Sequence, residues 1–298
     1  MVRQYKIHTN LDGTDDKVWD VTNGKVRFYQ PSNLGLQSTN NIWQSNGIGV
    51  MGTRSITQPQ IEFKLETFGE SLEENYQLMK DFINDILNQK FVTLEYQTEI
   101  FQVYADLALA DVTKTEGYGK NGTFSEKITF DIITKWYTYE NLTFEKIQNG
   151  QVLSGKSKIY GGTAPGSYKY VEGISYTYYG ESDIDRLSRW DIKDEIFSFM
   201  GILYPQLPKT PTGVRFLDDI GNEYTAIVFK TEELQDYILI NTDVNDETYQ
   251  GWKGTTALNL FPVMDFERYR TRIIEKGQME LINLTKAEFK VKRKADFV

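Results

Sequence analysis

Apolar residues recur at helical spacing most clearly in residues 71–90. Five of them follow one another at steps of four and three, as one face of an α-helix requires, and two more widen the stripe. The stripe consists of Leu72, Tyr76, Met79, Ile83 and Ile86, widened by Phe82 and Leu87. Ser71 followed by Glu74 has the spacing of a capping box, which specifies where a helix begins. We therefore predict a helix that buries Met79, Ile83 and Ile86 against a sheet.

The segments on either side of this helix alternate with a period of two. Residues 61–66 and 91–96 read as strands, and a second pair of strands follows at 100–112 and 124–139 around a glycine-rich turn. In the strand at 100–112, four residues share one face, namely Val103, Ala105, Leu107 and Leu109. The pattern predicts a long hairpin here and a sheet covered by a single helix.

The N-terminal region offers short strands and one long polar stretch. Short strands joined by turns fit residues 5–28 best. Residues 31–49 are rich in Asn, Ser, Gln and Gly, which predicts a long loop facing a partner or solvent. Residues Gly47–Gly52 match GxGxxG, but the dinucleotide fingerprint needs a strand before it and a helix after it, so we interpret them as a flexible loop.

Beyond residue 139 the chain changes character. Residues 150–180 hold seven glycines and six tyrosines with no helical period, which indicates loop-rich β structure or an extended projection. Residues 185–199 fit a short helix and a strand almost equally well. Short strands recur from residue 214 to the end at the intervals of a β-sandwich, and the last of them, rich in lysine, reads as an edge strand. A second, all-β domain is expected.

Composition and charge argue against several classes of function. A chain of 298 residues exceeds the usual size of a single core, so two domains are favoured. The formal charge of −9 argues against a surface for nucleic acid or anionic lipid. The absence of cysteine excludes disulfides, thiolate metal sites and Cys nucleophiles. No long apolar run is present, so we expect a protein that is made in a cytoplasm and enters neither a membrane nor the secretory pathway.

Candidate catalytic and metal-binding motifs each have a simpler explanation. His8 is the only histidine, which limits a triad or a histidine metal site to one position, and a hydrogen-bonded or exposed side chain fits it better. The run from Asp243 to Glu247 resembles the start of a calcium loop, but Thr248 stands where the sharp turn needs glycine, so a solvated β-turn is favoured. We expect no catalytic residue, no cofactor and no metal.

The order of several short segments resembles the N-terminal domain of siphophage distal tail proteins, called Dit, and is closest to those of lactococcal phages. The segments are Tyr5-Lys-Ile, Trp19-Asp-Val-Thr-Asn-Gly24, Leu34-Gly-Leu, the Gly47–Gly52 segment, the strand-helix-strand block, Lys114-Thr-Glu and the closing Ile128-Thr-Phe and Lys135-Trp-Tyr. They extend over about the first 140 residues. The second half, with Tyr237-Ile-Leu-Ile-Asn-Thr-Asp and the lysine-rich final strand, is similar to the galectin-like sandwich of that family.

The resemblance implies a mainly β protein with two domains that have different functions. Residues 1–140 would form a β-sandwich-like, ring-forming domain with one covering helix, and residues 141–298 a galectin-like sandwich with an arm-like extension near 145–190. It further implies a structural virion protein, a homo-hexameric ring that joins the tail tube to the baseplate around a channel for DNA. The implied partners are the tail tube protein, a tail-tip protein and the receptor-binding protein, with no specific nucleic-acid binding. Such a protein would assemble in the host cytoplasm and reside at the tail tip of the virion.

Six tyrosines are candidate docking residues in the extension. They are Tyr160, Tyr168, Tyr170, Tyr176, Tyr178 and Tyr179. Tyrosine offers a large contact area and a hydroxyl suited to a wet rim, which favours a docking element for another tail protein, although the same residues also fit half-buried sandwich strands. Two other functions stay open for the second domain: a carbohydrate-binding module with an aromatic platform, and a glycoside hydrolase with paired carboxylates acting on host cell-wall polysaccharide.

Overall fold

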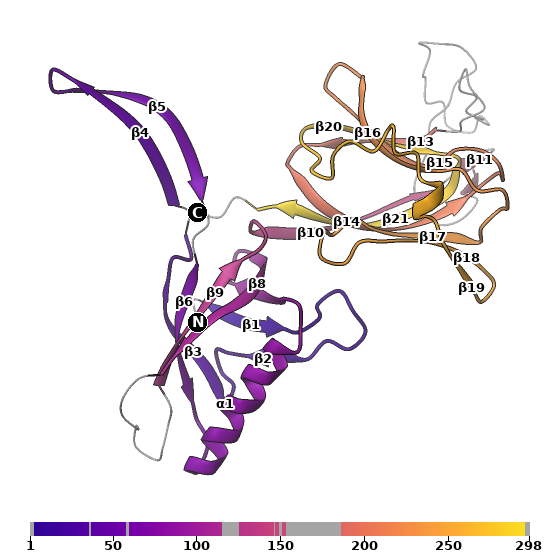
Figure 1. The fold of residues 1–298 in the computed structure, drawn as a ribbon. Helices are drawn as coiled ribbons and strands as arrows, with labels where there is room; N and C mark the ends of the chain where they lie inside the picture. Colours follow the sequence, from indigo (N-terminus) through magenta and orange to yellow (C-terminus); the bar gives the residue numbers. More distant parts are fainter. Residues whose placement is uncertain are drawn as a thin grey trace. The chain divides into compact units, whose positions relative to one another are not determined.

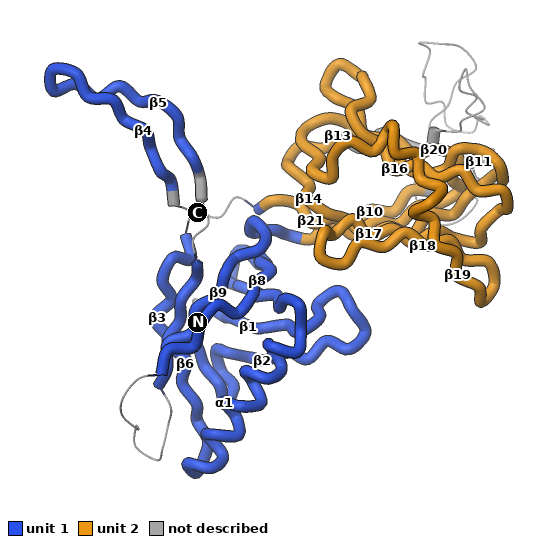
Figure 2. Tube along the Cα trace, viewed as in Figure 1, with its two compact units in different colours: residues 1–138, 295–298 blue, residues 139–294 orange. Residues whose placement is uncertain are grey.

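A computed structural model describes residues 3–35, 37–57, 60–114, 125–145, 147–148, 151–152 and 186–295. The chain divides into two compact units, unit 1 (residues 1–138 and 295–298) and unit 2 (residues 139–294), as Figure 2 shows. Both consist mainly of β-strands, which confirms the predicted fold class, and α1 is the one α-helix among the described residues (Figure 1). The division falls two residues before the predicted boundary, and Ala295 groups with unit 1.

Unit 1 is built on a continuous antiparallel sheet with the strand order β2-β1-β7-β8-β9-β6-β3. Its strands are β1 (Gln4–His8), β2 (Val18–Asp20), β3 (Val26–Ser32), β6 (Ile61–Thr67), β7 (Val92–Gln97), β8 (Gln102–Thr113) and β9 (Ser125–Ile132). Strands β6, β7 and β8 match the predicted strands, and β8 and β9 form the predicted hairpin, but the strand predicted over residues 124–139 is interrupted after Ile132. A further strand, β10 (Tyr137–Glu145), begins beside β8 and continues into unit 2.

Helix α1 (Leu72–Leu87) begins where the sequence predicted. The Ser71 hydroxyl caps it by accepting a hydrogen bond from the Glu74 backbone N–H, while the Glu74 carboxylate accepts from the N–H of Glu70 rather than from that of Ser71. Phe82 is fully buried and meets Trp19 and Phe28 edge to face, with ring centroids 5.2 and 5.8 Å apart. The helix therefore covers the sheet of unit 1 through an aromatic contact.

The predicted buried face of α1 is wrong in part. Ile86 is buried, but Met79 and Ile83 are only half-buried, and three stripe residues, Leu72, Tyr76 and Leu87, are exposed. Asn75 is buried instead, because its side-chain amide bonds the backbone N–H and C=O of Gly69 and the C=O of Ser71. A polar side chain that satisfies the backbone before the helix thus takes an inward position that an apolar pattern alone cannot reveal.

Unit 2 is a sandwich of two antiparallel sheets. One has the order β19-β18-β17-β14-β21-β10 and the other β13-β20-β15-β16. Its strands are β11 (Ile147–Gln148), β12 (Gln151–Val152), β13 (Arg186–Ile192), β14 (Ile196–Pro205), β15 (Thr212–Leu217), β16 (Glu223–Phe229), β17 (Tyr237–Asn241), β18 (Thr248–Lys253), β19 (Thr256–Asn259), β20 (Gly277–Ile282) and β21 (Leu284–Lys294), with a 3₁₀ helix η2 (Phe261–Val263). Phe199, Phe216 and Phe289 belong to the core of this unit.

Two expectations for unit 2 are decided by strand pairing. Residues 186–192 and 196–205 are strands, so the segment left open between helix and strand is not helical. The lysine-rich strand β21 is not an edge strand, because it lies between β14 and β10. Its lysines are accommodated by partners: Lys292 is buried and bonds Asp243 at 2.9 Å, and Lys290 lies 3.9 Å from the ring centroid of Tyr139.

Candidate functional site

The segment predicted as a long loop contains a β-hairpin instead. Strands β4 (Gln37–Ser45) and β5 (Ile48–Thr57) pair only with each other among the described residues and form a sheet of their own (Figure 1). The two residues between the strands, Asn46 and Gly47, have φ values of 52° and 80°. Positive φ at both positions is the mark of a type I′ turn, for which Asn-Gly is the preferred sequence. The predicted flexible loop at Gly47–Gly52 is therefore a turn followed by the strand β5.

Both faces of this hairpin are apolar near its tip. Trp43 pairs with Val50 and Ile42 with Met51, and because successive residues of a strand point to opposite sides, the two pairs lie on opposite faces. The Trp43 indole lies against Gly52, where an added Cβ would stand 3.2 Å from the indole nitrogen. A larger residue at position 52 would therefore have to displace the Trp43 indole slightly.

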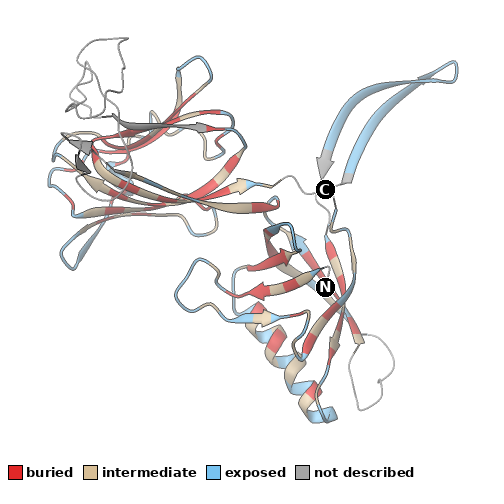
Figure 3. Ribbon diagram, turned by 180° about the vertical axis from the view of Figure 1, so that it is seen from behind, coloured by how far each residue is buried: buried red, intermediate tan, exposed pale blue. Residues whose placement is uncertain are grey.

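The hairpin is also exposed and nearly free of charge. Residues 38–55 are all exposed, as the pale blue ribbon in Figure 3 shows, and Trp43 and Val50 are 68% and 60% exposed. Arg54 is the single charged residue between Gln37 and Thr57, whereas 25% of the whole chain is charged. Large exposed apolar side chains without charges characterise the centre of a protein interface rather than a solvated surface.

Unit 1 presents apolar residues at a second place, the turn between β7 and β8. Ile100 is 88% exposed and Phe101 is 36% exposed. The turn is held by Thr98, whose hydroxyl accepts hydrogen bonds from the backbone N–H groups of both residues, at 3.3 and 3.2 Å. A fixed turn therefore presents these apolar side chains to solvent.

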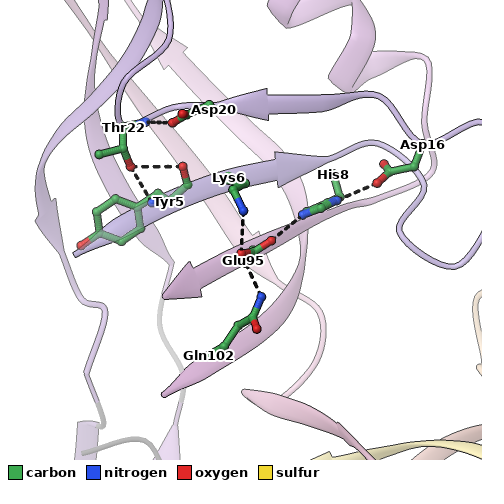
Figure 4. A network of polar contacts seen from close by, with 8 residues as sticks. All are labelled: Tyr5, Lys6, His8, Asp16, Asp20, Thr22, Glu95 and Gln102. Atoms are coloured by element: carbon green, nitrogen blue, oxygen red, sulfur yellow. Dashed lines mark hydrogen bonds and ion pairs between the residues drawn. The ribbon is translucent and has the colours of Figure 1, made fainter. Parts of the chain in front are cut away.

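A buried polar network joins strands β1, β7 and β8 of unit 1 (Figure 4). The Glu95 carboxylate contacts Lys6 Nζ at 3.0 Å, His8 Nε2 at 2.8 Å and Gln102 Nε2 at 2.9 Å. The other ring nitrogen of His8, Nδ1, lies 2.6 Å from Asp16 Oδ2, so both nitrogens face carboxylate oxygens. Burial acts to raise the pKa of Glu95, but hydrogen bonds from His8 and Lys6 outweigh it and lower that pKa below its usual value.

This network has the geometry of a structural clasp. Asp16 also accepts a hydrogen bond from the Asn10 backbone N–H at 3.0 Å, so the loop between β1 and β2 is tied through His8 to strand β7. His8 is 8% exposed and fully engaged, as the simpler explanation of this residue predicted. Among the described residues, no group of three or more His, Cys, Asp or Glu side chains is arranged to hold a metal ion.

The calcium-like run in unit 2 forms a turn, but not a solvated one. The Asp246 N–H donates to the Asp243 C=O, and the Asn245 N–H donates to the Asp243 side chain. Asp243 is buried because its carboxylate is paired with Lys292. The acidic side chain therefore anchors the turn to β21, which the sequence pattern did not predict.

The outer face of one sheet of unit 2 is hollowed by a groove of about 520 Å³. Met200, Ile202 and Leu239 of β14 and β17 give it an apolar floor, with Glu288 and Lys290 of β21 beside them. The stacked pair Tyr237 and Trp252, with centroids 6.0 Å apart, lies at the other end of β17 and β18. Neither aromatic residue lines the groove.

The six predicted docking tyrosines, residues 160–179, lie outside the described residues. No helix in the described parts of the chain is long and apolar enough to cross a membrane. The hairpin β4–β5 is the candidate site that sequence reasoning missed, and the turn sequence Asn46-Gly47 was the signal that identifies it.

Comparison with known proteins covers the whole chain. The family model "Distal tail protein, N-terminal domain" matches residues 4–133, and "Dit, C-terminal domain" matches residues 135–298. The distal tail proteins of Lactococcus phages p2 and SK1 are 94% and 90% identical to this chain over 298 residues, with 100% of each chain covered.

Solved structures give the same match. A chain in the structure of the phage p2 baseplate in its activated conformation with Ca is 94% identical, with a TM-score of 0.79 and 100% of both chains covered. The Dit protein of phage SPP1 shares the fold at 10% identity, with a TM-score of 0.52 over 96% of this chain and 98% of that one.

Proposed function

This chain belongs to the distal tail protein family of phages, and from that premise we propose that it forms a hexameric ring at the tail tip. It is a structural protein of the virion, and the ring joins the tail tube to the baseplate. The observation that carries the proposal is the match of both family domains along the chain, together with 94% identity to a protein of the phage p2 baseplate.

The two units have different tasks in this proposal. Residues 1–140 close the ring around a channel through which DNA passes without specific binding, as the formal charge of −9 favours. Residues 141–298 carry the receptor-binding proteins. The ring contacts the tail tube protein on one side and a tail-tip protein on the other, and it assembles in the host cytoplasm before the virion is released.

The extension near 145–190 is the proposed docking element for the receptor-binding protein. Its six tyrosines, Tyr160, Tyr168, Tyr170, Tyr176, Tyr178 and Tyr179, provide contact area with few rotatable bonds. Replacement of residues 150–180 by a short Gly/Ser linker should keep the ring and the cooperative melting of unit 2 while abolishing capture of the receptor-binding protein. Aggregation or loss of cooperative melting would place these tyrosines in a core.

The mass of the purified, assembled protein tests whether the ring forms. A heterologous interface repeated around an axis must close into a ring or continue into a filament. Native mass spectrometry and light scattering of the purified protein should give six copies, and negative-stain images should show a ring with a central hole. A monomer at all micromolar concentrations would contradict the proposal.

A further inference from the structure

We propose that the outer face of the sheet β19-β18-β17-β14-β21-β10 in unit 2 is a binding site for a short, neutral oligosaccharide. The site combines the groove floored by Met200, Ile202 and Leu239 with the aromatic residues that border it. A saccharide site adds to the proposed carrier role of unit 2, and it does not depend on the ring, because every residue involved lies within one unit of one chain.

The strand register brings the groove floor and the aromatic residues onto one face. Ile202 of β14 is paired with Leu239 of β17, and Tyr237, two residues before Leu239, is paired with Trp252 of β18. Residues two apart in a strand share a face and lie about 7 Å from each other, so the Tyr237–Trp252 pair borders the floor. Tyr204, two residues after Ile202, adds a third aromatic side chain to the same border.

Packing within the fold does not account for these aromatic side chains. The core of unit 2 lies on the other face of the sheet, where Leu203 and Ile238 are fully buried, whereas Tyr204 and Tyr237 are only half-buried. The buried indole nitrogen of Trp252 has no hydrogen-bond partner among the described residues. Because a buried tryptophan N–H usually finds a partner, a small shift of this ring would offer an unused donor to a ligand oxygen.

Polar groups surround the apolar floor of the groove. Asn141 and Thr248 line it, and Glu288 and Lys290 lie beside the floor. The carboxylate accepts hydrogen bonds, the ammonium group donates them, and the amide and the hydroxyl do both. A sugar ring has apolar C–H faces and hydroxyl groups around its edge, so it matches an apolar floor with polar sides. A purely apolar ligand would bury these polar groups without partners, which costs free energy.

Charge favours a neutral ligand over an anionic polymer. The chain has a formal charge of −9, which repels polyanions. On the face itself, Lys286 forms an ion pair with Glu288, and Lys290 lies 3.9 Å from the ring centroid of Tyr139. The cations of this face are therefore engaged within the fold, which leaves hydroxyl groups as the better partners for its polar side chains.

Two other occupants of the groove fit less well. The strands of the floor, β14 and β17, are each paired on both edges, so an extended peptide cannot add to them as a further strand. Glu288 is the one carboxylate among the described residues that line the groove, whereas glycoside hydrolysis needs two carboxyl groups that flank the bond. The groove is therefore suited to hold a sugar and not to cleave it.

Calorimetric titration of the full-length protein tests the site, with lactose, maltotetraose, cellotetraose, chitotetraose and L-rhamnose as probes. We expect saturable binding of at least one probe, in the millimolar range or tighter. Met200→Lys puts an ammonium group on the groove floor and should weaken this binding at least tenfold, whereas Ile220→Lys puts the same charge on an exposed turn and should not change it. No binding of any probe, or equal binding by Met200→Lys, would overturn the inference.

A variant of nearly unchanged shape separates a sugar from an apolar ligand. Asn141→Leu removes an amide from the side of the groove at an exposed position, so the fold should not suffer. Sugar affinity should fall by about threefold or more because a hydrogen bond is lost. An unchanged or raised affinity would contradict recognition of hydroxyl groups. Equal melting temperatures of the variants and the unmodified protein show that the fold is kept.

A spectroscopic readout locates the bound sugar. Incorporation of 5-fluorotryptophan gives one ¹⁹F signal for each of the five tryptophans. We expect the sugar that binds to shift the signal of Trp252, beside the groove, and to leave that of Trp43, on the hairpin of unit 1, in place. Binding without a shift at Trp252 would place the sugar elsewhere and refute the assignment.

These outcomes also distinguish the sugar site from the proposed function. Six-copy rings that bind no sugar would leave the proposed function standing and remove the site, and sugar binding by a protein that stays monomeric would do the reverse. Polygalacturonate serves as an anionic probe. Binding of this polymer alone, without any neutral probe, would likewise rule out a site for neutral oligosaccharides.

Discussion

Helix α1 and the hairpin β4–β5 both carry large apolar residues, but they place them in opposite environments. In α1, Phe82 and Ile86 are 0% and 3% exposed, because the sheet of unit 1 supplies their cover. In the hairpin, Trp43 and Val50 are 68% and 60% exposed, so the described residues give them little cover. The helix is therefore covered by its own chain, whereas the hairpin presents its apolar side chains to solvent.

The polar residues of the helix and of the hairpin also differ. The helix has charged residues on its exposed side and Asp85, which accepts a hydrogen bond from the Trp19 indole at 3.0 Å, near its end. The hairpin surrounds its apolar residues with uncharged Asn, Gln, Ser and Thr, and its one charged side chain, Arg54, bonds Asn40 at 2.9 Å. Uncharged polar groups lose less hydration energy than charges when an interface closes, so this composition suits a surface that must be soluble first and buried later.

The largest expected effect separates the two regions by stability. Phe82→Ala removes a fully buried ring that contacts Trp19 and Phe28, so it should lower the free energy of unfolding by about 3–5 kcal/mol. Trp43→Ala should change that of the dissociated chain by less than about 0.5 kcal/mol, because its side chain is exposed there. Urea denaturation at a concentration below assembly measures both. Equal losses would mean that the hairpin packs on its own chain.

A smaller effect concerns the polar clasp that holds the body of unit 1. Glu95→Gln removes the charge that accepts hydrogen bonds from Lys6 and His8, and it should cost about 1–3 kcal/mol near neutral pH. The folded pKa of Glu95 is lowered, so its contribution is present above the usual carboxyl pKa of 4.5 and is lost as the pH falls through the lower folded value.

Melting temperatures of the unmodified protein and Glu95→Gln should therefore converge as the pH falls below about 4.5. The matched control is Glu99→Gln, which removes an exposed carboxylate four residues further along the chain. A difference between the unmodified protein and Glu95→Gln that stays constant down to acidic pH would contradict the role of the ionised carboxylate.

The smallest effect is expected at the hairpin turn. Gly47 has φ of 80° with open space around it, so Gly47→Ala meets no clash and only a backbone strain of about 1 kcal/mol. The substitution should loosen the hairpin and weaken assembly by up to about fivefold without moving the melting of the dissociated unit 1. An unchanged assembly constant would show that the turn takes no part in assembly.

The body of both units could be predicted from the sequence because its patterns reflect contacts within the chain. The period of two in β6 and the capping residue Ser71 report buried and local interactions directly, whereas in β7 the alternating polar residues Thr93 and Glu95 are buried too. The rotation of the helix face could not be predicted, because it depends on Asn75 finding backbone partners at Gly69 and Ser71. The central place of β21 could not be predicted either, since the partner that permits a buried Lys292 is Asp243, distant in sequence.

The hairpin was missed for the opposite reason. Its apolar residues have no cover within the chain, so a search for one buried face and one polar face finds neither, and the many Asn, Gln and Ser residues favour a loop. The turn chemistry of Asn46-Gly47 carried the information that the hydrophobic pattern lacked. An exposed hairpin of this kind is identified by its turn and by its lack of charge, not by amphipathicity.

Amide hydrogen exchange of the assembled protein and of the dissociated chain tests the central claim most directly, because it reports both regions in one experiment. The account predicts that the amides of Gln37–Thr57 are protected on assembly by at least tenfold, while those of Leu72–Leu87 keep the same protection in both states. Equal exchange of the hairpin in the two states, with the ring intact, would contradict the claim that its apolar faces become buried on assembly.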